Sequence, residues 1–371
     1  MTRATCGLYG ILPLLALALA GCHSPAAPVV KPRKVKSSYA VGTRNITLED
    51  KTRPTPANGG VPSVPYRSLN TDIFYPAVAS ATAAATPFAP LDPTGAPYPL
   101  VIFVHGSDGA SQQYTYLTEA LAARGYVVVA GNFPLTWINQ PGNSSDLYSN
   151  MQVGDVSFLA DQLAEMAGDA KDPLHGAISP SDGYAVAGHS TGGTVSLASA
   201  YGFTDHDDRV QAIVALAPCA CFFATSFFKT RIVPMMVLAG TDDGFVPPAD
   251  NGERAFALSN SPRWLAMLTG GQHLFFTDLD ATDASISGGL DEVTMNDSDI
   301  SVAFSADGAG NACVPNPVFG TDPIIPFDLQ HSLTVALAAG FLDEQMFGDP
   351  TTLAAVTTNP DPHLKLQQAG Y

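Results

Sequence analysis

Short apolar runs alternate with helical patterns over most of the chain. The runs PLVIFVHG (99–106), YAVAGH (184–189) and MMVLAG (235–240) are almost continuously apolar. Strands that are covered by helices on both faces have this composition, because neither face meets water. The segment 151–166 instead repeats its large apolar residues every three or four positions, which indicates a helix with one buried face. The pattern therefore predicts strands separated by helices.

The remaining segments continue this alternation. Further strands are expected in NITLED, SLNTDIFYP, GYVVVAGNFP, VQAIVALAP and RWLAMLTG, and further helices in YTYLTEALAAR, TVSLASAYG and LTVALAAGFLDEQMF. Single helices between strands imply parallel pairing with right-handed crossovers. We therefore expect an α/β protein with a doubly wound, mostly parallel sheet and helices on both faces. One domain is expected at 45–350, followed by a C-terminal tail at 351–371.

Two stretches, at about 130–150 and about 278–325, show neither the pattern of a strand nor that of a helix. Insertions of this length in a compact domain are often functional, so we expect both to border a site. The second stretch is acidic, but it lacks the ligand spacing of an EF-hand calcium loop. No metal site is predicted.

The first residues form a targeting sequence. Residues 1–21 place Arg3 before an apolar stretch and end in small residues, as a secretory signal peptide does. The letters LAGC at 19–22 match a bacterial lipobox, in which the Cys is acylated and becomes the first residue of the mature chain. We expect export, lipidation of Cys22 and anchoring to the membrane of the bacterial cell envelope. Cleavage of an ordinary signal peptide is the alternative.

Residues 22–44 are rich in Pro, Ser and Lys, and we expect them to form a disordered tether. Three of the five cysteines lie in the expected domain, namely Cys219, Cys221 and Cys313. Two Cys separated by one residue are too close to bridge comfortably. We therefore expect a disulfide between Cys313 and either Cys219 or Cys221, and export makes this oxidation feasible.

The charge of the chain limits its partners. It has 34 Asp and Glu against 17 Lys and Arg, which gives a formal net charge of -17. This charge repels phosphate backbones and excludes nucleic acid as a partner, so we interpret the acidic surface as an aid to solubility. The only long apolar run lies at the N-terminus, which excludes a polytopic membrane protein. We expect a monomer.

The segment GHSTGG at 188–193 matches the motif GxSxG between a predicted strand and a predicted helix. A strand that turns directly into a helix forces its central residue into a strained conformation, and side chains two positions away would clash with neighbouring backbone. Ser190 is therefore predicted to project from the carboxyl edge of the sheet as a nucleophile. The helix N-terminus beside it favours a developing negative charge.

A serine hydroxyl needs a base, and the base needs an orienting carboxylate. In a sheet of this kind the acid and then the histidine are expected to follow the serine along the chain. The loop after 235–240 contains Asp242 and Asp243, of which Asp243 is favoured because it begins the spacing D-x-x-V-P. His273 follows this loop at the end of a predicted strand and is the expected base, chosen from eight histidines.

An oxyanion hole requires two backbone N–H groups. Thr191 follows the nucleophile and is expected to provide one of them. Ser107, in the loop after the run 99–106, is expected to provide the other, with His105 bracing that loop.

Together these residues resemble the α/β-hydrolases, and within them the esterases that include platelet-activating-factor acetylhydrolases, chlorophyllases, dienelactone hydrolases and cutinase-like polyester hydrolases. The shared landmarks are HGSDG, DVSFLADQL, GHSTGG, GTDDGFVP and GGQHLFFTD. The chain departs from parts of this group, since it has no obvious lid helix, no Gly-Gly-Gly oxyanion motif and no cysteine nucleophile. The resemblance implies a carboxylic ester hydrolase that forms an acyl-enzyme, needs no cofactor and acts on lipid-type, small acyl or polyester substrates.

Two alternatives stay open. The same residues can cleave amides, thioesters or lactones, and the fold can also serve as a non-catalytic binding scaffold on a surface lipoprotein. Phe133, Trp137 and Phe245 lie on loops beside the expected site. Each is a candidate for the wall of an apolar substrate pocket and equally a candidate for the core.

Overall fold

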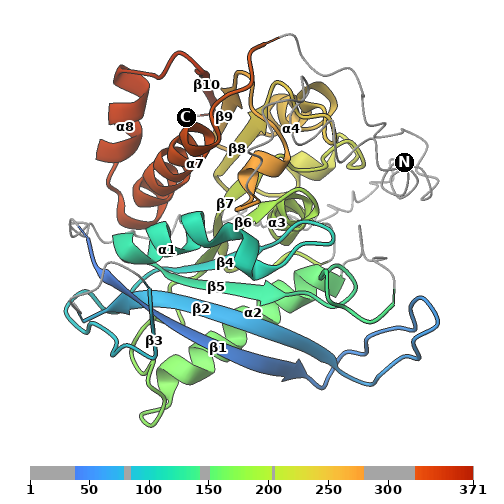
Figure 1. The fold of residues 1–371 in the computed structure, drawn as a ribbon, viewed down its shortest axis with the longest axis vertical. Helices are drawn as coiled ribbons and strands as arrows, with labels where there is room; N and C mark the ends of the chain where they lie inside the picture. Colours follow the sequence, from blue (N-terminus) through green and yellow to red (C-terminus); the bar gives the residue numbers. More distant parts are fainter. Residues whose placement is uncertain (1–37, 79–84, 143–150, 203–204, 280–321, 371) are drawn as a thin grey trace, which may run out of the picture.

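The computed structural model describes residues 38–78, 85–142, 151–202, 205–279 and 322–370. Within these residues one sheet of ten strands extends across the molecule in the order β10-β9-β8-β7-β6-β4-β5-β2-β1-β3 (Figure 1). Its strands are β1 (Ala40–Asp50), β2 (Arg67–Ala77), β3 (Thr86–Pro87), β4 (Leu100–Val104), β5 (Val127–Asn132), β6 (Tyr184–His189), β7 (Val210–Leu216), β8 (Met235–Gly240), β9 (Arg263–Leu268) and β10 (Leu364–Ala369).

The centre of the sheet is parallel, as predicted. Strands β9, β8, β7, β6, β4 and β5 pair in parallel, whereas β2 and β10 join them antiparallel on opposite sides. The chain runs from β4 to β5 on one side and returns with β6 on the other side of β4. The strand order therefore reverses between β4 and β6, and such a reversal leaves a crevice at the carboxyl ends of the strands.

Helices cover both faces, which confirms the predicted fold class. One face carries α1 (Thr115–Arg124), α7 (Phe327–Leu342) and α8 (Thr351–Thr358), and the other carries α2 (Met151–Gly168), α3 (Thr191–Tyr201) and α4 (Gly252–Leu258). Strand β4 contributes to both cores, because successive side chains point to opposite faces. Leu100, Ile102 and Val104 pack with α2 and α3, whereas Val101 and Phe103 pack with α1 and α7. Burial on both faces accounts for the continuous apolar run.

The domain extends further at both ends than the sequence pattern indicated. Strand β1 begins at Ala40, within the residues expected to form a tether. The expected tail at 351–371 is wrong, because α8 packs on α7 and β10 pairs with β9 at the edge of the sheet. The segment of β10 contains only two large apolar residues, Leu364 and Leu366, so its pattern resembles that of a polar tail.

In the described part of the chain no helix is both long enough and apolar enough to cross a membrane. The expected signal peptide at 1–21 and the lipidation site Cys22 lie outside the described residues.

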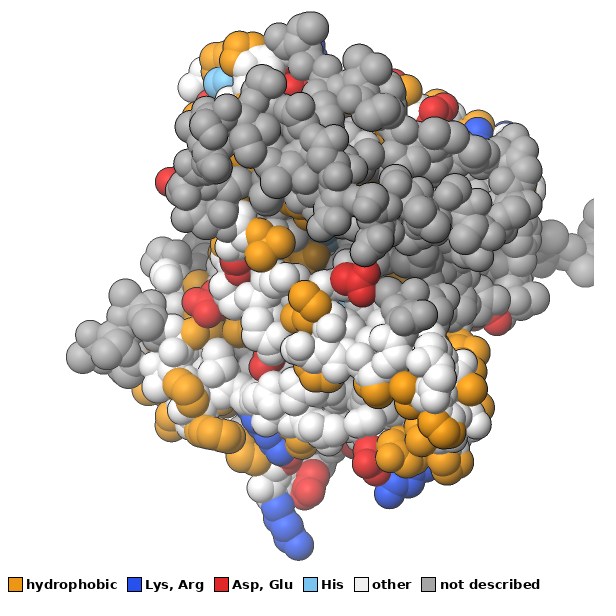
Figure 2. Space-filling model, turned by 45° about the vertical axis from the view of Figure 1, so that its right-hand side comes forward, with side chains coloured by type: hydrophobic (Ala, Val, Ile, Leu, Met, Phe, Trp, Pro, Cys, Tyr) orange, Lys and Arg blue, Asp and Glu red, His pale blue; other side chains and the backbone are white. Residues whose placement is uncertain are grey.

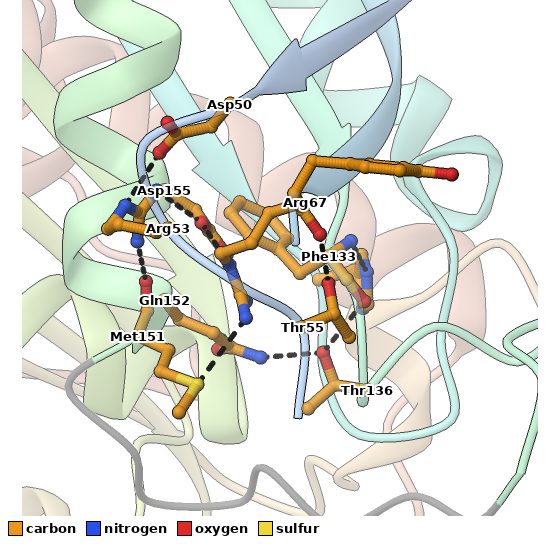
Figure 3. A network of polar contacts seen from close by, with 11 residues as sticks. Asp50, Arg53, Thr55, Arg67, Phe133, Thr136, Met151, Gln152 and Asp155 are labelled. Carbon is orange, nitrogen blue, oxygen red and sulfur yellow. Dashed lines mark hydrogen bonds and ion pairs between the residues drawn. The ribbon is translucent and has the colours of Figure 1, made fainter. Parts of the chain in front are cut away.

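A buried ion pair joins β2 to α2 (Figure 3). Arg67 is fully buried, and its guanidinium donates two hydrogen bonds to the carboxylate of Asp155, at 2.7 and 2.6 Å. Arg53 donates a third hydrogen bond to Asp155 at 2.6 Å and another to Asp50 at 2.6 Å. A buried charge is tolerated when it is paired and hydrogen-bonded in this way. The pair fixes the N-terminal part of α2 against the antiparallel side of the sheet.

Candidate active site

Ser190 connects β6 to α3 in a strained backbone conformation. Its φ is 56° and its ψ is -122°, a combination that residues other than glycine rarely adopt. Its N–H donates to the carbonyl oxygen of Leu216 at the end of β7, at 2.9 Å. This bond holds the turn at the carboxyl edge of the sheet. The residue follows β6, the neighbour of β4 in the sheet, and lies at the N-terminus of α3.

Gly188 and Gly192 make this turn possible. A Cβ atom on Gly192 would overlap the carbonyl oxygen of Val104, and a Cβ atom on Gly188 would overlap the carbonyl oxygen of Gly192. Both obstacles are backbone atoms, which cannot rotate away. The two glycines of the motif are therefore required by the close approach of α3 to β4 and β6.

The loops after β8 and β9 bring an acid and a histidine together. His273 Nδ1 lies 2.8 Å from Asp243 Oδ2, and both side chains are buried. Oδ1 of the same carboxylate accepts hydrogen bonds from the N–H groups of Phe245, at 3.0 Å, and Val246, at 2.6 Å. The two amides hold the carboxylate so that its other oxygen faces the imidazole. A carboxylate at Nδ1 favours the tautomer in which Nε2 is the basic nitrogen.

Asp242, the alternative acid, has different partners. Its carboxylate accepts a hydrogen bond from Thr241 Oγ1 at 3.3 Å. Burial raises the pKa of Asp242, and the negative charge of Asp322 raises it further. Of the two neighbouring aspartates, Asp243 is the one that the structure pairs with His273.

Two contacts place Ser190 beside this pair. The ring of His189, which precedes Ser190, lies 4.5 Å from the ring of His273, measured between centroids. The Cys219 thiol lies close enough to the side chain of Ser190 and to the carboxylate of Asp243 for both to influence its pKa. Burial raises the pKa of this thiol to about 12, and the carboxylate of Asp243 also raises it. The predicted nucleophile, base and acid thus lie at one edge of the sheet.

The loop after β4 lies against the serine. A Cβ atom on Gly106 would be 3.2 Å from the Cβ atom of Ser190, and Ser107 Oγ donates to Thr191 Oγ1 at 3.1 Å. Within the described segments no hydrogen bond engages the backbone N–H of Ser107 or of Thr191. Two N–H groups beside a nucleophile are what an oxyanion hole requires.

His105 connects this loop to the end of β5. The N–H of Phe133 donates to His105 Nε2 at 3.1 Å, so Nδ1 carries the proton and donates to the carbonyl oxygen of Gly106 at 2.7 Å. Burial lowers the pKa of His105 to about 4, which keeps the ring neutral. Gln152 of α2 supports the same region, because its Nε2 donates to Thr136 Oγ1 at 2.6 Å (Figure 3).

Tyr114 and His189 form a polar contact that the sequence did not indicate. The Tyr114 hydroxyl accepts from the N–H of Gly106 at 3.1 Å and lies 3.0 Å from His189 Nδ1. Burial holds the pKa of His189 well below its usual range, and the neighbouring His273 lowers it further. A neutral His189 can accept a hydrogen bond from the Tyr114 hydroxyl at Nδ1. His189 is a variable position of GxSxG and Tyr114 is the first residue of a predicted helix, so only the fold brings them together.

The three aromatic residues considered for a substrate pocket lie in different environments. Phe133 is fully buried in the core and packs on His105 with 5.5 Å between ring centroids, so it is not a pocket residue. Phe245 lies over the site, with its ring centroid 5.2 Å from that of His273. Trp137 is partly exposed and pairs through a β-bridge with Gly109, which lies in the loop after β4.

The two cysteines in the described part of the chain differ in oxidation state. Cys219 is a free, buried thiol, whereas Cys221 is disulfide-bonded. Cys313, the expected partner, lies outside the described residues, so the pairing stays a prediction.

Among the described residues no group of three His, Cys, Asp or Glu side chains is arranged to hold a metal ion. Among the described residues on the face shown in Figure 2, acidic side chains lie scattered between polar and apolar ones and form no continuous patch. Most of the acidic stretch at 278–325 lies outside the described residues.

Comparison with known proteins agrees with this fold. The chlorophyllase family model matches residues 70–243, which is just under half of the chain and includes Ser107, Ser190 and Asp243 but ends before His273. A solved structure of a ferulic acid esterase from Streptomyces cinnamoneus is similar, with a TM-score of 0.57 and 20% sequence identity over 92% of this chain and 98% of that chain. At this identity the likeness concerns the fold. No curated protein matches the chain.

Proposed function

We propose that this chain, an ester hydrolase of the α/β-hydrolase superfamily, cleaves carboxylic esters through an acyl-enzyme on Ser190. The observation that carries the proposal is the buried pair of His273 and Asp243 beside a serine in a strained turn. The family match supports ester hydrolysis as the class of reaction. The roles of the individual residues come from their geometry.

The reaction begins when Ser190 Oγ attacks the ester carbonyl carbon and His273 Nε2 takes the hydroxyl proton. Asp243 stabilises the imidazolium that forms. The negative charge moves to the carbonyl oxygen, where the N–H groups of Ser107 and Thr191 donate to it. Each such donor contributes about 3 kcal/mol to the transition state. Collapse of the tetrahedral intermediate then breaks the ester C–O bond, and His273 returns the proton to the leaving alcohol.

Water completes the cycle by the same route. His273 takes a proton from water, the hydroxide attacks the acyl carbon, and Ser190 leaves with the proton that His273 returns. The products are a carboxylic acid and the enzyme in its starting state. The steps balance with the ester and one water molecule.

The enzyme is assayed with p-nitrophenyl esters from acetate to palmitate to find which acyl chains it accepts. Methyl ferulate and chlorophyll are added because the two comparisons name enzymes that act on such esters. Matched p-nitroanilides separate ester from amide cleavage. Wild type is expected to hydrolyse esters and to bind a fluorophosphonate covalently, whereas Ser190→Ala does neither. Ser199→Ala, which removes a buried hydroxyl from α3, the helix that follows Ser190, is the matched control and keeps the activity. Equal inactivity of wild type and Ser190→Ala toward all of these reagents would overturn the proposal in favour of a binding scaffold.

We also propose that the protein is held at the bacterial envelope by acylated Cys22, on the strength of the lipobox at 19–22. Expression in a bacterial host with an alkyne fatty acid tests this, since wild type should take up the label and fractionate with membranes. Cys22→Ala should lose the label and the membrane association. A labelled Cys22→Ala protein would contradict the anchor.

A further inference from the structure

Two consecutive residues of α7 hold the two ends of the loop that carries His273. Gln330 is fully buried, its Oε1 accepts from the N–H of Gln272 at 3.0 Å, and its Nε2 donates to the carbonyl oxygen of Gln272 at 2.8 Å. His331 Nε2 donates to the carbonyl oxygen of Thr277 at 2.9 Å. Between these contacts the short helix η4 (Leu274–Phe276) packs against α7.

The contact between Gln330 and Gln272 is geometrically restrictive. A side-chain amide that accepts from a peptide N–H and donates to the C=O of the same residue pairs with the backbone as a neighbouring strand would. It fixes the rotation of that segment as well as its position. Both groups are buried, so losing their partner incurs a desolvation penalty that water does not offset. Gln272 directly precedes His273, and a rotation here changes the direction of the imidazole.

The imidazole itself has further contacts. Asp243 Oδ2 lies 2.8 Å from Nδ1, and the rings of His189 and Phe245 lie 4.5 and 5.2 Å from the imidazole between centroids. The contact from α7 acts instead on the backbone that carries the ring.

We propose that Gln330 is a positioning residue, which acts through Gln272 to hold His273 Nε2 at the distance from Ser190 that proton transfer requires. The inference rests on the proposed function, in which His273 is the base. His331 holds the far end of the same loop, and its ring is stacked on Tyr116 with 3.7 Å between centroids.

The test compares Gln330→Leu with Ser261→Ala. Ser261 is a buried side chain that also satisfies a backbone N–H, because its Oγ accepts from the N–H of Val233. It lies just before β9, at the amino end of the strand, whereas His273 follows the carboxyl end. We expect Gln330→Leu to lower kcat by roughly 10- to 100-fold, because a misplacement of about 1 Å has effects of this size. KM should change by less than about twofold, since ground-state binding is retained. The acidic limb of the pH profile of kcat/KM should move to lower pH, because an imidazole that is poorly aligned with its carboxylate holds its proton less tightly. Ser261→Ala should lose stability without either change.

Gln330→Glu provides a second variant in case the first does not fold. A buried carboxyl group favours its neutral form. In that form it can accept from the N–H of Gln272 and donate to the carbonyl oxygen, as the amide does. The activity of Gln330→Glu relative to wild type at the same pH should therefore rise as the pH falls.

Different results would contradict the proposed function and the positioning role of Gln330. If wild type neither hydrolyses esters nor reacts with a fluorophosphonate, the proposed function fails. If wild type is active but kcat and the acidic limb of Gln330→Leu match those of Ser261→Ala, only the positioning role fails. A pH-independent ratio for Gln330→Glu would likewise contradict that role.

Discussion

The hydroxyl of Tyr114 lies 3.0 Å from Nδ1 of His189, and this contact joins two parts of the site that come from different loops. On one side Tyr114 accepts from the N–H of Gly106 in the oxyanion loop. On the other side the ring of His189 lies against that of His273. Because all these groups are buried, a displacement of the oxyanion loop is transmitted to the proposed base through rigid contacts.

Replacement of Tyr114 by Phe tests this connection. The change leaves the N–H of Gly106 and Nδ1 of His189 without their hydroxyl partner, which should lower the free energy of unfolding by about 1–3 kcal/mol. Activity should fall as well, because the oxyanion loop loses a support. Urea unfolding and ester hydrolysis measure the two effects. Tyr98→Phe removes a buried hydroxyl that donates to Asp92 O at 2.6 Å and should lower stability alone. Equal activity of the two variants would count against the connection.

The two neighbouring aspartates should differ sharply in their effect on activity. Asp243→Asn replaces the carboxylate at His273 Nδ1 by an amide and should reduce kcat by about 10⁴-fold, because the imidazole is then held in the wrong tautomer. Asp242→Asn should retain activity to within about threefold, since its contacts are to Thr241 and not to the imidazole. Steady-state hydrolysis of a p-nitrophenyl ester distinguishes them. The reverse order of effects would reassign the acid.

Stability should depend on pH through His105. Burial lowers its pKa from the usual 6.5 to about 4 in the folded chain. Between these values the unfolded chain binds the proton and the folded chain does not, so stability increases with pH. The contribution of the neutral ring is complete above about pH 6.5 and is lost as the pH falls toward 4, by roughly 3 kcal/mol in total.

His105→Asn provides the measurement. The variant should be less stable at pH 7, because the contacts to Gly106 and Phe133 are lost. Between pH 7 and pH 5, however, wild type should lose about 2 kcal/mol more than the variant in urea unfolding. His189 is present in both proteins, so its own contribution cancels. Parallel pH dependences would show that the ring of His105 is not the group responsible.

The sequence predicted the elements whose pattern is local. The apolar runs of β4, β6 and β8 indicate buried strands because each residue is covered on one face or the other. The motif around Ser190 reports a backbone requirement, and the order of acid and histidine follows from the topology. These are the features that fix which loops meet at the carboxyl edge.

Features that depend on contacts across the fold were not predictable. Gln330 is separated from Gln272 by more than fifty residues, and nothing in its own segment distinguishes it from a polar residue of a helix. Tyr114 and His189 meet only when α1 packs against the sheet. Strand β10 lies at an edge and needs few apolar residues, and α4 is only seven residues long. Each is defined by its partner and not by a periodicity.

The effects of replacing Arg67 and Asp155 on the free energy of unfolding should be strongly coupled, because the two side chains form a buried ion pair (Figure 3). Arg67→Met leaves a buried carboxylate with one remaining cation, Arg53, and should lower the free energy of unfolding by about 3–5 kcal/mol. Arg67→Met combined with Asp155→Leu removes both charges and should be more stable than Arg67→Met alone, because two apolar side chains replace a buried carboxylate that has lost its bidentate partner. Urea unfolding of the two single variants and the double variant gives the coupling energy. Losses that simply add would show that the two side chains act independently, despite hydrogen bonds of 2.6 and 2.7 Å between them.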